Sequence, residues 1–178
     1  MGVDEKTKKI LSDLKSVDSE FVIETISQIK ESGNSTILLA LIELLHQTSD
    51  DEIKKSILAL LAELKDKSSV PILVSAITNP EYENERRELV ASCWQNGLGY
   101  NEYLPLFIDL IIREDFLIAF EAFTVIENMF GVIPDEVIEL EIVKIEKAQM
   151  AADEQKSYLL TNILSMIRNI PEEREYSQ

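Results

Sequence analysis

The sequence predicts an all-α protein, a right-handed α-α superhelix (solenoid) of about five antiparallel helix pairs. Apolar residues recur at helical spacing almost everywhere, as at Ile53, Ile57, Leu60 and Leu64, without the sustained alternation typical of strands. Between residues 50 and 129 the chain repeats an apolar helix, a short polar turn and a second helix that opens with charge. Because one such pair cannot bury its apolar face alone, neighbouring pairs must stack to complete the core.

Caps and helix breakers locate the individual helices. The candidate N-caps are Asp18, Ser35, Asp50, Ser68, Asp115, Asp135 and Asp153. The glycines expected near helix ends are Gly33, Gly97 and Gly131. The resulting helices are expected at about 4–16, 18–31, 36–47, 50–65, 69–78, 82–96, 101–113, 115–130, 135–149 and 153–169.

These helices are expected to form one repeat domain over residues 1–170. The predicted pairs span about 4–31, 36–65, 69–96, 101–130 and 135–169. The tail 171–178 carries no apolar face and is expected to be flexible.

The segment 50–64, DDEIKKSILALLAEL, resembles the second helix of HEAT and HEAT-like (armadillo-type) repeats. In that family an acidic turn leads to a valine-arginine pair and then to an alanine- and leucine-rich stretch. Pro71 and Pro105 look like the proline of the family's first helix, at the tolerated first helical turn. The resemblance covers roughly residues 35–130 and is weak in the outer pairs, as capping repeats would be.

Two features depart from the HEAT pattern. Ala119 replaces the basic residue in the fourth pair, and an extra Glu81-Tyr82 segment lengthens the turn in the third. Tetratricopeptide repeats are the competing interpretation, because their period is similar. Their tryptophan, glycine and tyrosine pattern is not matched by residues 94–100, where glycine and leucine come in the wrong order.

Composition narrows the classes of partner. The chain has 178 residues, of which 46% are apolar, and 17 basic against 33 acidic side chains give a net charge of −16. This charge repels phosphate backbones and anionic lipid surfaces, so neither nucleic acid nor a membrane is an expected partner. Acidity of this size is explained either by solubility or by a basic protein partner.

The sequence also bears on cellular location. The lone cysteine, Cys93, excludes an intramolecular disulfide and is expected to be a buried small hydrophobe. No apolar secretion segment opens the sequence, and no run of about 18 apolar residues follows. We therefore expect a cytoplasmic protein.

No residue is assigned a catalytic, cofactor-binding or metal-binding role. His46 is the only histidine, so the usual Cys/His zinc sites cannot form, and its imidazole is expected to cap carbonyls at a helix end. No glycine-rich phosphate loop occurs. The carboxylates of the acidic helix are expected on a solvated face, and they are Glu136, Glu139, Glu141 and Glu146. The apolar residues expected to pack that helix are Val137, Ile138, Leu140, Ile142 and Ile145.

The fourth pair carries the sharpest functional signal. Three outward positions that are polar in the second and third pairs become Phe116, Leu117 and Phe120. Tyr100 and Tyr103, from the preceding helix, are expected to join them. These residues form either a protein-binding surface with aromatic anchors or an extra buried contact under the loop 97–101 or the fifth pair.

We expect a non-enzymatic protein-interaction scaffold or adaptor whose partner is a protein, and the acidic charge favours a basic one. Some HEAT-like proteins are enzymes, including alkylpurine DNA glycosylases and bilin lyases, so the resemblance leaves an enzyme or an enzyme's accessory subunit as an alternative. A structural homodimer through the fourth pair is a further alternative.

Overall fold

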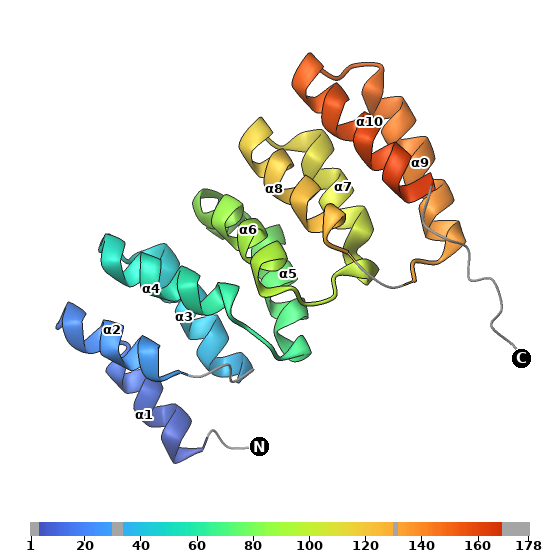
Figure 1. Cartoon of the computed structure of the whole chain (residues 1–178). Coiled ribbons are helices and arrows are strands. Elements are labelled where there is room, and N and C mark those ends of the chain that lie inside the picture. Colours follow the sequence, from blue (N-terminus) through green and yellow to red (C-terminus); the bar gives the residue numbers. More distant parts are fainter. Residues whose placement is uncertain (1–3, 30–33, 130–131, 169–178) are drawn as a thin grey trace, which may run out of the picture. The chain divides into compact units, whose positions relative to one another are not determined.

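Residues 4–29, 34–129 and 132–168 are described in a computed structural model, and within these ranges the chain forms ten α-helices and no strand (Figure 1). The all-α prediction is therefore confirmed, and each of the ten expected helices is present. The chain divides into two compact units, residues 1–98 and 99–178. The boundary falls between the third and fourth predicted pairs, so a single domain over 1–170 stays a prediction.

The first unit consists of three helix pairs. Its helices are α1 (Glu5–Asp13), α2 (Ser19–Gln28), α3 (Ser35–Gln47), α4 (Asp51–Ala62), α5 (Val70–Thr78) and α6 (Arg86–Asn96). The second helices pack side by side in the order α2, α4, α6, and the first helices in the order α1, α3, α5. The unit is therefore two helical layers with the core between them.

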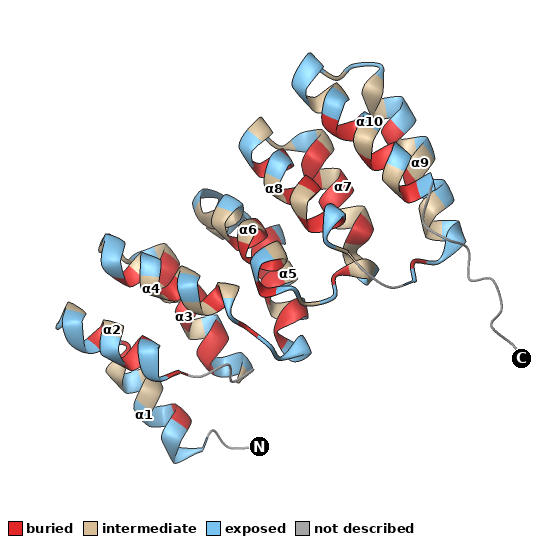
Figure 2. Cartoon of the chain, viewed as in Figure 1, coloured by how far each residue is buried: buried red, intermediate tan, exposed pale blue. Residues whose placement is uncertain are grey.

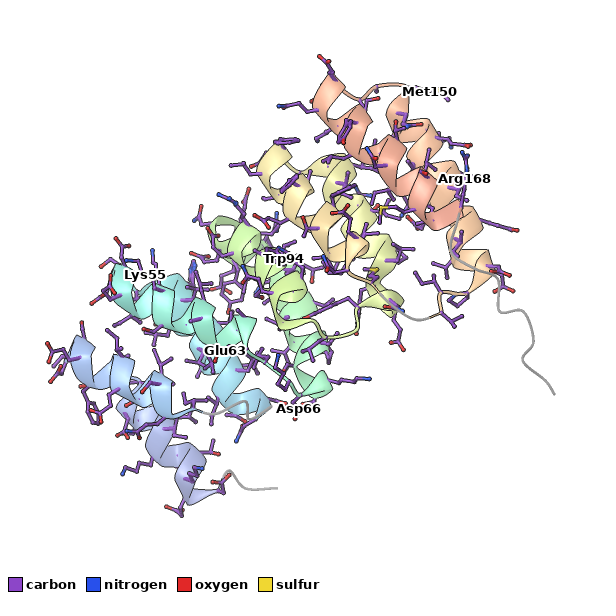
Figure 3. The ribbon with its side chains drawn as sticks, in the orientation of Figure 1. Lys55, Glu63, Asp66, Trp94, Met150 and Arg168 are labelled. Carbon is purple, nitrogen blue, oxygen red and sulfur yellow. The ribbon has the colours of Figure 1, made fainter. Side chains whose placement is uncertain are left out.

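The second unit consists of two helix pairs. Its helices are α7 (Leu104–Arg113), α8 (Phe116–Glu127), α9 (Asp135–Gln149) and α10 (Glu154–Arg168). Helix α7 packs against α8 and α9, and α10 packs against α8 and α9. Arg168 near the end of α10 forms an ion pair with Glu146 of α9 (Figure 3).

Side-chain caps explain where most helices begin. Asp18, Asp50 and Asp115 each accept backbone N–H bonds as predicted, and Asp153 accepts one from Lys156. Gly97 ends α6 in the left-handed conformation, with φ of 65°. Gly33 and Gly131 lie outside the described residues.

Three predicted N-caps are wrong. Asn34, not Ser35, caps α3, because its side chain accepts from the backbone N–H groups of Thr36 and Ile37. Asp135 is the first residue of α9, after Pro134 at the cap position. Ser68 lies inside a 3₁₀ turn, Lys67–Ser69 (η1), and α5 begins after it at Val70.

The helix predicted over 82–96 begins later than expected. Its first turns are a 3₁₀ segment, Pro80–Glu85 (η2), and the α-helix starts at Arg86. Asn79 caps this segment by accepting from the Glu81 N–H at 3.0 Å, and Tyr82 departs from helical geometry. A third 3₁₀ turn, Asn101–Tyr103 (η3), precedes α7. The η2 and η3 turns therefore replace the first residues of the helices predicted over 82–96 and 101–113.

The buried residues lie where helices of the same unit meet (Figure 2). Leu41, Ile57 and Leu89 are fully buried in the first unit, and Phe107 and Ile108 in the second. Cys93 is buried as predicted. The outward helix faces are thus left to carry any binding chemistry.

Candidate protein-binding surface

The cap of α8 sets which of its side chains face outward. Asp115 Oδ1 accepts the N–H groups of Leu117 at 2.8 Å and Ile118 at 3.0 Å. From this start, Ile118 and Ala122 point into the core and are buried. With about 100° between successive residues, positions 117 and 120 fall on the other face.

That outward face is apolar, as the sequence predicted. Leu117 is 52% exposed and Phe120 is 48% exposed, while Phe116 is half-buried. The rings form a run along the helix, with centroids 6.1 Å apart for Phe116 and Phe120 and 6.5 Å apart for Phe120 and Phe123. Phe120 therefore has ring contacts with Phe116 and Phe123 of its own helix, and both Phe120 and Leu117 remain about half exposed.

The two tyrosines expected to join this surface are less exposed than Leu117 and Phe120. Tyr100 is 2% exposed and packs edge to face on Phe107, with 5.9 Å between ring centroids. The prediction that Tyr100 contributes to the surface is therefore wrong, because its ring completes the core at the start of α7. Tyr103 is half-buried at the end of η3.

Helix α10 adds an aromatic side chain that the sequence reasoning missed. Tyr158 is exposed and follows its cap, Asp153, by the same five residues that separate Phe120 from Asp115. Because α8 and α10 pack together, equal cap register is expected to bring both rings to the outward side. The cap spacing was the signal that would have found it. We call Leu117, Phe120 and Tyr158 the α8–α10 face.

An ion-pair network links α9 to α7. It shows that the solvent-exposed face predicted for α9 is wrong at Glu141. Glu141 is 5% exposed and pairs with Lys144 at 2.8 Å, and Lys144 also reaches Asp109 of α7 at 3.2 Å. Burial lowers the pKa of Lys144, but hydrogen bonds and charge attraction from the two carboxylates outweigh it and raise the pKa overall. Glu141 is thus not on the solvated face, and the apolar Leu140, expected to be packed, is 70% exposed.

A polar cluster joins η2 to α3 in the first unit. Tyr82 donates a 3.0 Å hydrogen bond to Glu43, and the rings of Tyr82 and His46 meet edge to face at 5.5 Å. Burial and the Glu43 carboxylate raise the pKa of Tyr82 to about 12. His46 Nδ1 lies 3.1 Å from Glu85 Oε2. The sequence predicted that this imidazole would cap carbonyls at the end of its helix. The structure places the Glu85 carboxylate beside it instead.

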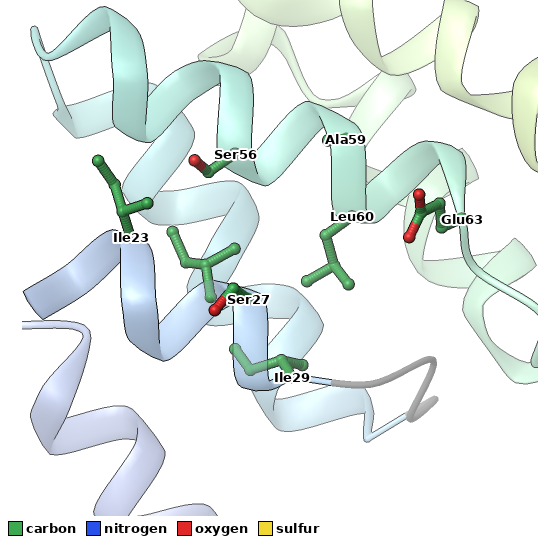
Figure 4. Close-up of a pocket in the computed structure, with 8 residues that line it drawn as sticks. Ile23, Ser27, Ile29, Ser56, Ala59, Leu60 and Glu63 are labelled. Atoms are coloured by element: carbon green, nitrogen blue, oxygen red, sulfur yellow. The ribbon is translucent and has the colours of Figure 1, made fainter. Parts of the chain in front are cut away.

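An open groove of about 650 Å³ lies between α2 and α4 (Figure 4). Ile23 and Ile26 line it from α2 and Leu60 from α4, while Ser56 and Ala59 leave space between the helices. The sequence reasoning missed this groove. The groove forms where small outward residues of α2 and α4 lie side by side, although they are about thirty positions apart in the sequence. The pattern of one helix alone cannot reveal such a pairing.

Neither a metal-binding cluster nor a membrane-spanning helix occurs among the residues that the structure describes. No group of three or more histidine, cysteine, aspartate or glutamate side chains there could hold a metal ion. In the same part of the chain, no helix has the length and apolar character needed to cross a membrane.

Comparison with known proteins gives little similarity. No family model matches the chain, and no curated protein matches it. Among solved structures, the chain is similar to an engineered protein whose crystal structure was a Northeast Structural Genomics Consortium target. The match has 20% sequence identity and a TM-score of 0.45, and covers 89% of this chain and 78% of the other.

Proposed function

We propose that this chain is a non-enzymatic, cytoplasmic protein-interaction scaffold that binds a basic partner protein through the α8–α10 face. The observation that carries the proposal is the exposure of Leu117 and Phe120, which form an apolar surface at positions where the equivalent residues of α4 are polar. Adjacent exposed large apolar side chains are typical of interaction sites. Aromatic anchors of this kind supply most of the binding energy in many interfaces.

The same proposal includes a right-handed, HEAT-like superhelix of the five pairs. Support comes from within each unit, where alternate helices pack on one another: α2 on α4 and α4 on α6 in the first, and α8 on α10 in the second. This is the contact pattern of stacked helix pairs. A scaffold of stacked pairs presents its outward helix faces as a preformed surface, which reduces the entropic cost of binding.

Charge favours a basic partner. Residues 99–178 contain 16 acidic and six basic side chains. Three of those basic side chains, Arg113, Lys144 and Arg168, are already engaged by carboxylates of the same unit. The field around the α8–α10 face is therefore negative, which steers a positively charged partner and repels an acidic one.

The test compares wild-type protein with Leu117→Glu/Phe120→Glu as bait in a native lysate, followed by calorimetry with each purified partner. Both changes lie at exposed positions, so circular dichroism should show an unchanged fold. We expect a partner bound by the wild type to lose about 2 kcal/mol or more of affinity, roughly 30-fold in Kd. Affinity should also fall as salt rises.

Leu140→Glu/Val143→Glu is the matched control. It replaces two exposed apolar residues of α9, in the same unit, with the same charges. A partner lost with the α9 variant but kept by the α8 variant would move the binding surface to α9. Sedimentation of the chain alone tests the homodimer alternative, since self-association abolished by the α8 variant would make a second copy the occupant.

A further inference from the structure

We propose that the groove between α2 and α4 is a second binding site, which takes one basic amphipathic α-helix of a partner protein. The site lies in the first unit and does not depend on the α8–α10 face. Its lining, its length and the charges along its rim each bear on the occupant.

The groove has the dimensions of a helix-binding site. Helices α2 and α4 contain 10 and 12 residues, about 15 and 18 Å of helix. Ser19, the first residue of α2, hydrogen-bonds to Asp50, the cap of α4, so the two helices start at about the same level. Two level ridges enclosing about 650 Å³ accommodate about three turns of a third helix.

The lining is suited to the apolar face of that helix. Ile23 and Leu60 point into the groove from opposite sides (Figure 4). The small side chains of Ser27, Ser56 and Ala59 allow the backbone of an incoming helix to approach closely. Leucine-like anchors one turn apart would fill the space between them, as in other helix-in-groove complexes.

The rim selects a basic helix. Glu20 and Glu24 are exposed on α2, and Glu63 is exposed at the end of α4. With the two helices level, Glu20 and Glu63 are about 16 Å apart along the axes, the rise of about 11 helical residues. Lys55 does not offset these carboxylates, because it pairs with Glu52 at 2.6 Å (Figure 3). Lysine or arginine near both ends of the bound helix would complement the rim.

The test titrates the full chain into fluorescein-labelled helical peptides of about 18 residues. Each peptide carries leucines at helical spacing and two lysines about 11 residues apart, in three registers relative to the leucines. We expect saturable binding by fluorescence anisotropy in at least one register, weakened by salt. Amide chemical shifts should change at Ile23, Ser56 and Ala59.

Two matched variants locate the binding. Ala59→Arg places bulk and positive charge in the groove at an exposed helical position, and we expect it to weaken binding about tenfold or more. Ser75→Arg adds the same side chain to an exposed position of α5, outside the groove, and should leave binding unchanged. Leu117→Glu/Phe120→Glu should also leave it unchanged, which separates this proposal from the proposed function.

Several results would overturn the inference. These are no binding in any register, equal binding by Ala59→Arg, or shift changes outside α2 and α4. Equal binding of a peptide with glutamates in place of its lysines would reject a basic occupant. Self-association of the chain, abolished by Ala59→Arg, would identify a second copy as the occupant instead.

Discussion

Helices α4 and α8 begin alike and present opposite surfaces. Each follows an aspartate that accepts two backbone N–H groups, Asp50 in α4 and Asp115 in α8. At the second position after the cap, α4 has Glu52 where α8 has Leu117, and at the fifth it has Lys55 where α8 has Phe120. The cap and the inward residues therefore set the helix, and the outward residues are free to determine what it binds.

The inward residues of the two helices also differ in size. Seven residues after the cap, α4 has Ile57 and α8 has Ala122, and both are fully buried. Ile57 fills core volume with its own side chain, whereas the smaller Ala122 leaves that volume to be filled by other residues packed around α8. Equivalent positions in the repeat are thus not interchangeable, although both are apolar.

The largest expected effect tests this difference in core volume. Ile57→Ala should lower the free energy of unfolding by about 2–5 kcal/mol, because it removes a fully buried side chain and leaves a cavity. Ala122→Ile should cost about 1–3 kcal/mol through overpacking. Urea unfolding followed by circular dichroism measures both, and amide exchange should place the first loss in the first unit.

Ile57→Val is the graded control for that experiment, with an expected cost of about 0.5–1.5 kcal/mol. A tolerated Ala122→Ile, with stability unchanged, would mean that α8 packs loosely at this position. The contrast between the two helices would then be confined to their surfaces.

A smaller effect tests whether the two caps are equivalent. Asp50→Ala and Asp115→Ala should each cost about 1 kcal/mol, because each leaves two N–H groups of a first helical turn without their acceptor. Asp50→Asn and Asp115→Asn retain an acceptor oxygen and should cost much less. If one alanine variant were neutral and the other costly, the shared start of α4 and α8 would not reflect a shared energetic role.

Local patterns were sufficient to predict the helices and the exposed part of the candidate site. Helical spacing located all ten helices, and the polar-to-apolar change after Asp115 located Leu117 and Phe120. These features depend on residues within a turn or two of one another, so the sequence displays them directly. The same reasoning failed at Glu141 and Tyr100, whose contacts extend to other elements.

Non-local contacts explain the errors at Glu141 and Tyr100, whereas the wrong N-caps at Ser35, Ser68 and Asp135 are decided by neighbouring residues. Glu141 is buried because Lys144 bridges it to Asp109, which lies on a different helix. Tyr100 is buried because its ring packs on Phe107 after the η3 turn. Neither contact has a periodic signature, and a carboxylate or a tyrosine is expected at the surface unless its partner is known.

The smallest expected effect concerns the polar cluster that joins η2 to α3 in the first unit. The pKa of Tyr82 is raised to about 12, above an unfolded value of about 10. Burial and the hydrogen bond to Glu43 both disfavour the phenolate, so the linked stability is fully present below about pH 10 and is lost as the pH rises through 12. Tyr82→Phe should cost less than about 1 kcal/mol at neutral pH, because the pair is partly exposed. It should also remove the phenolate step near pH 12 from an ultraviolet titration. A titration in which Tyr82→Phe changes nothing above pH 11 would show that Tyr82 is not held by Glu43.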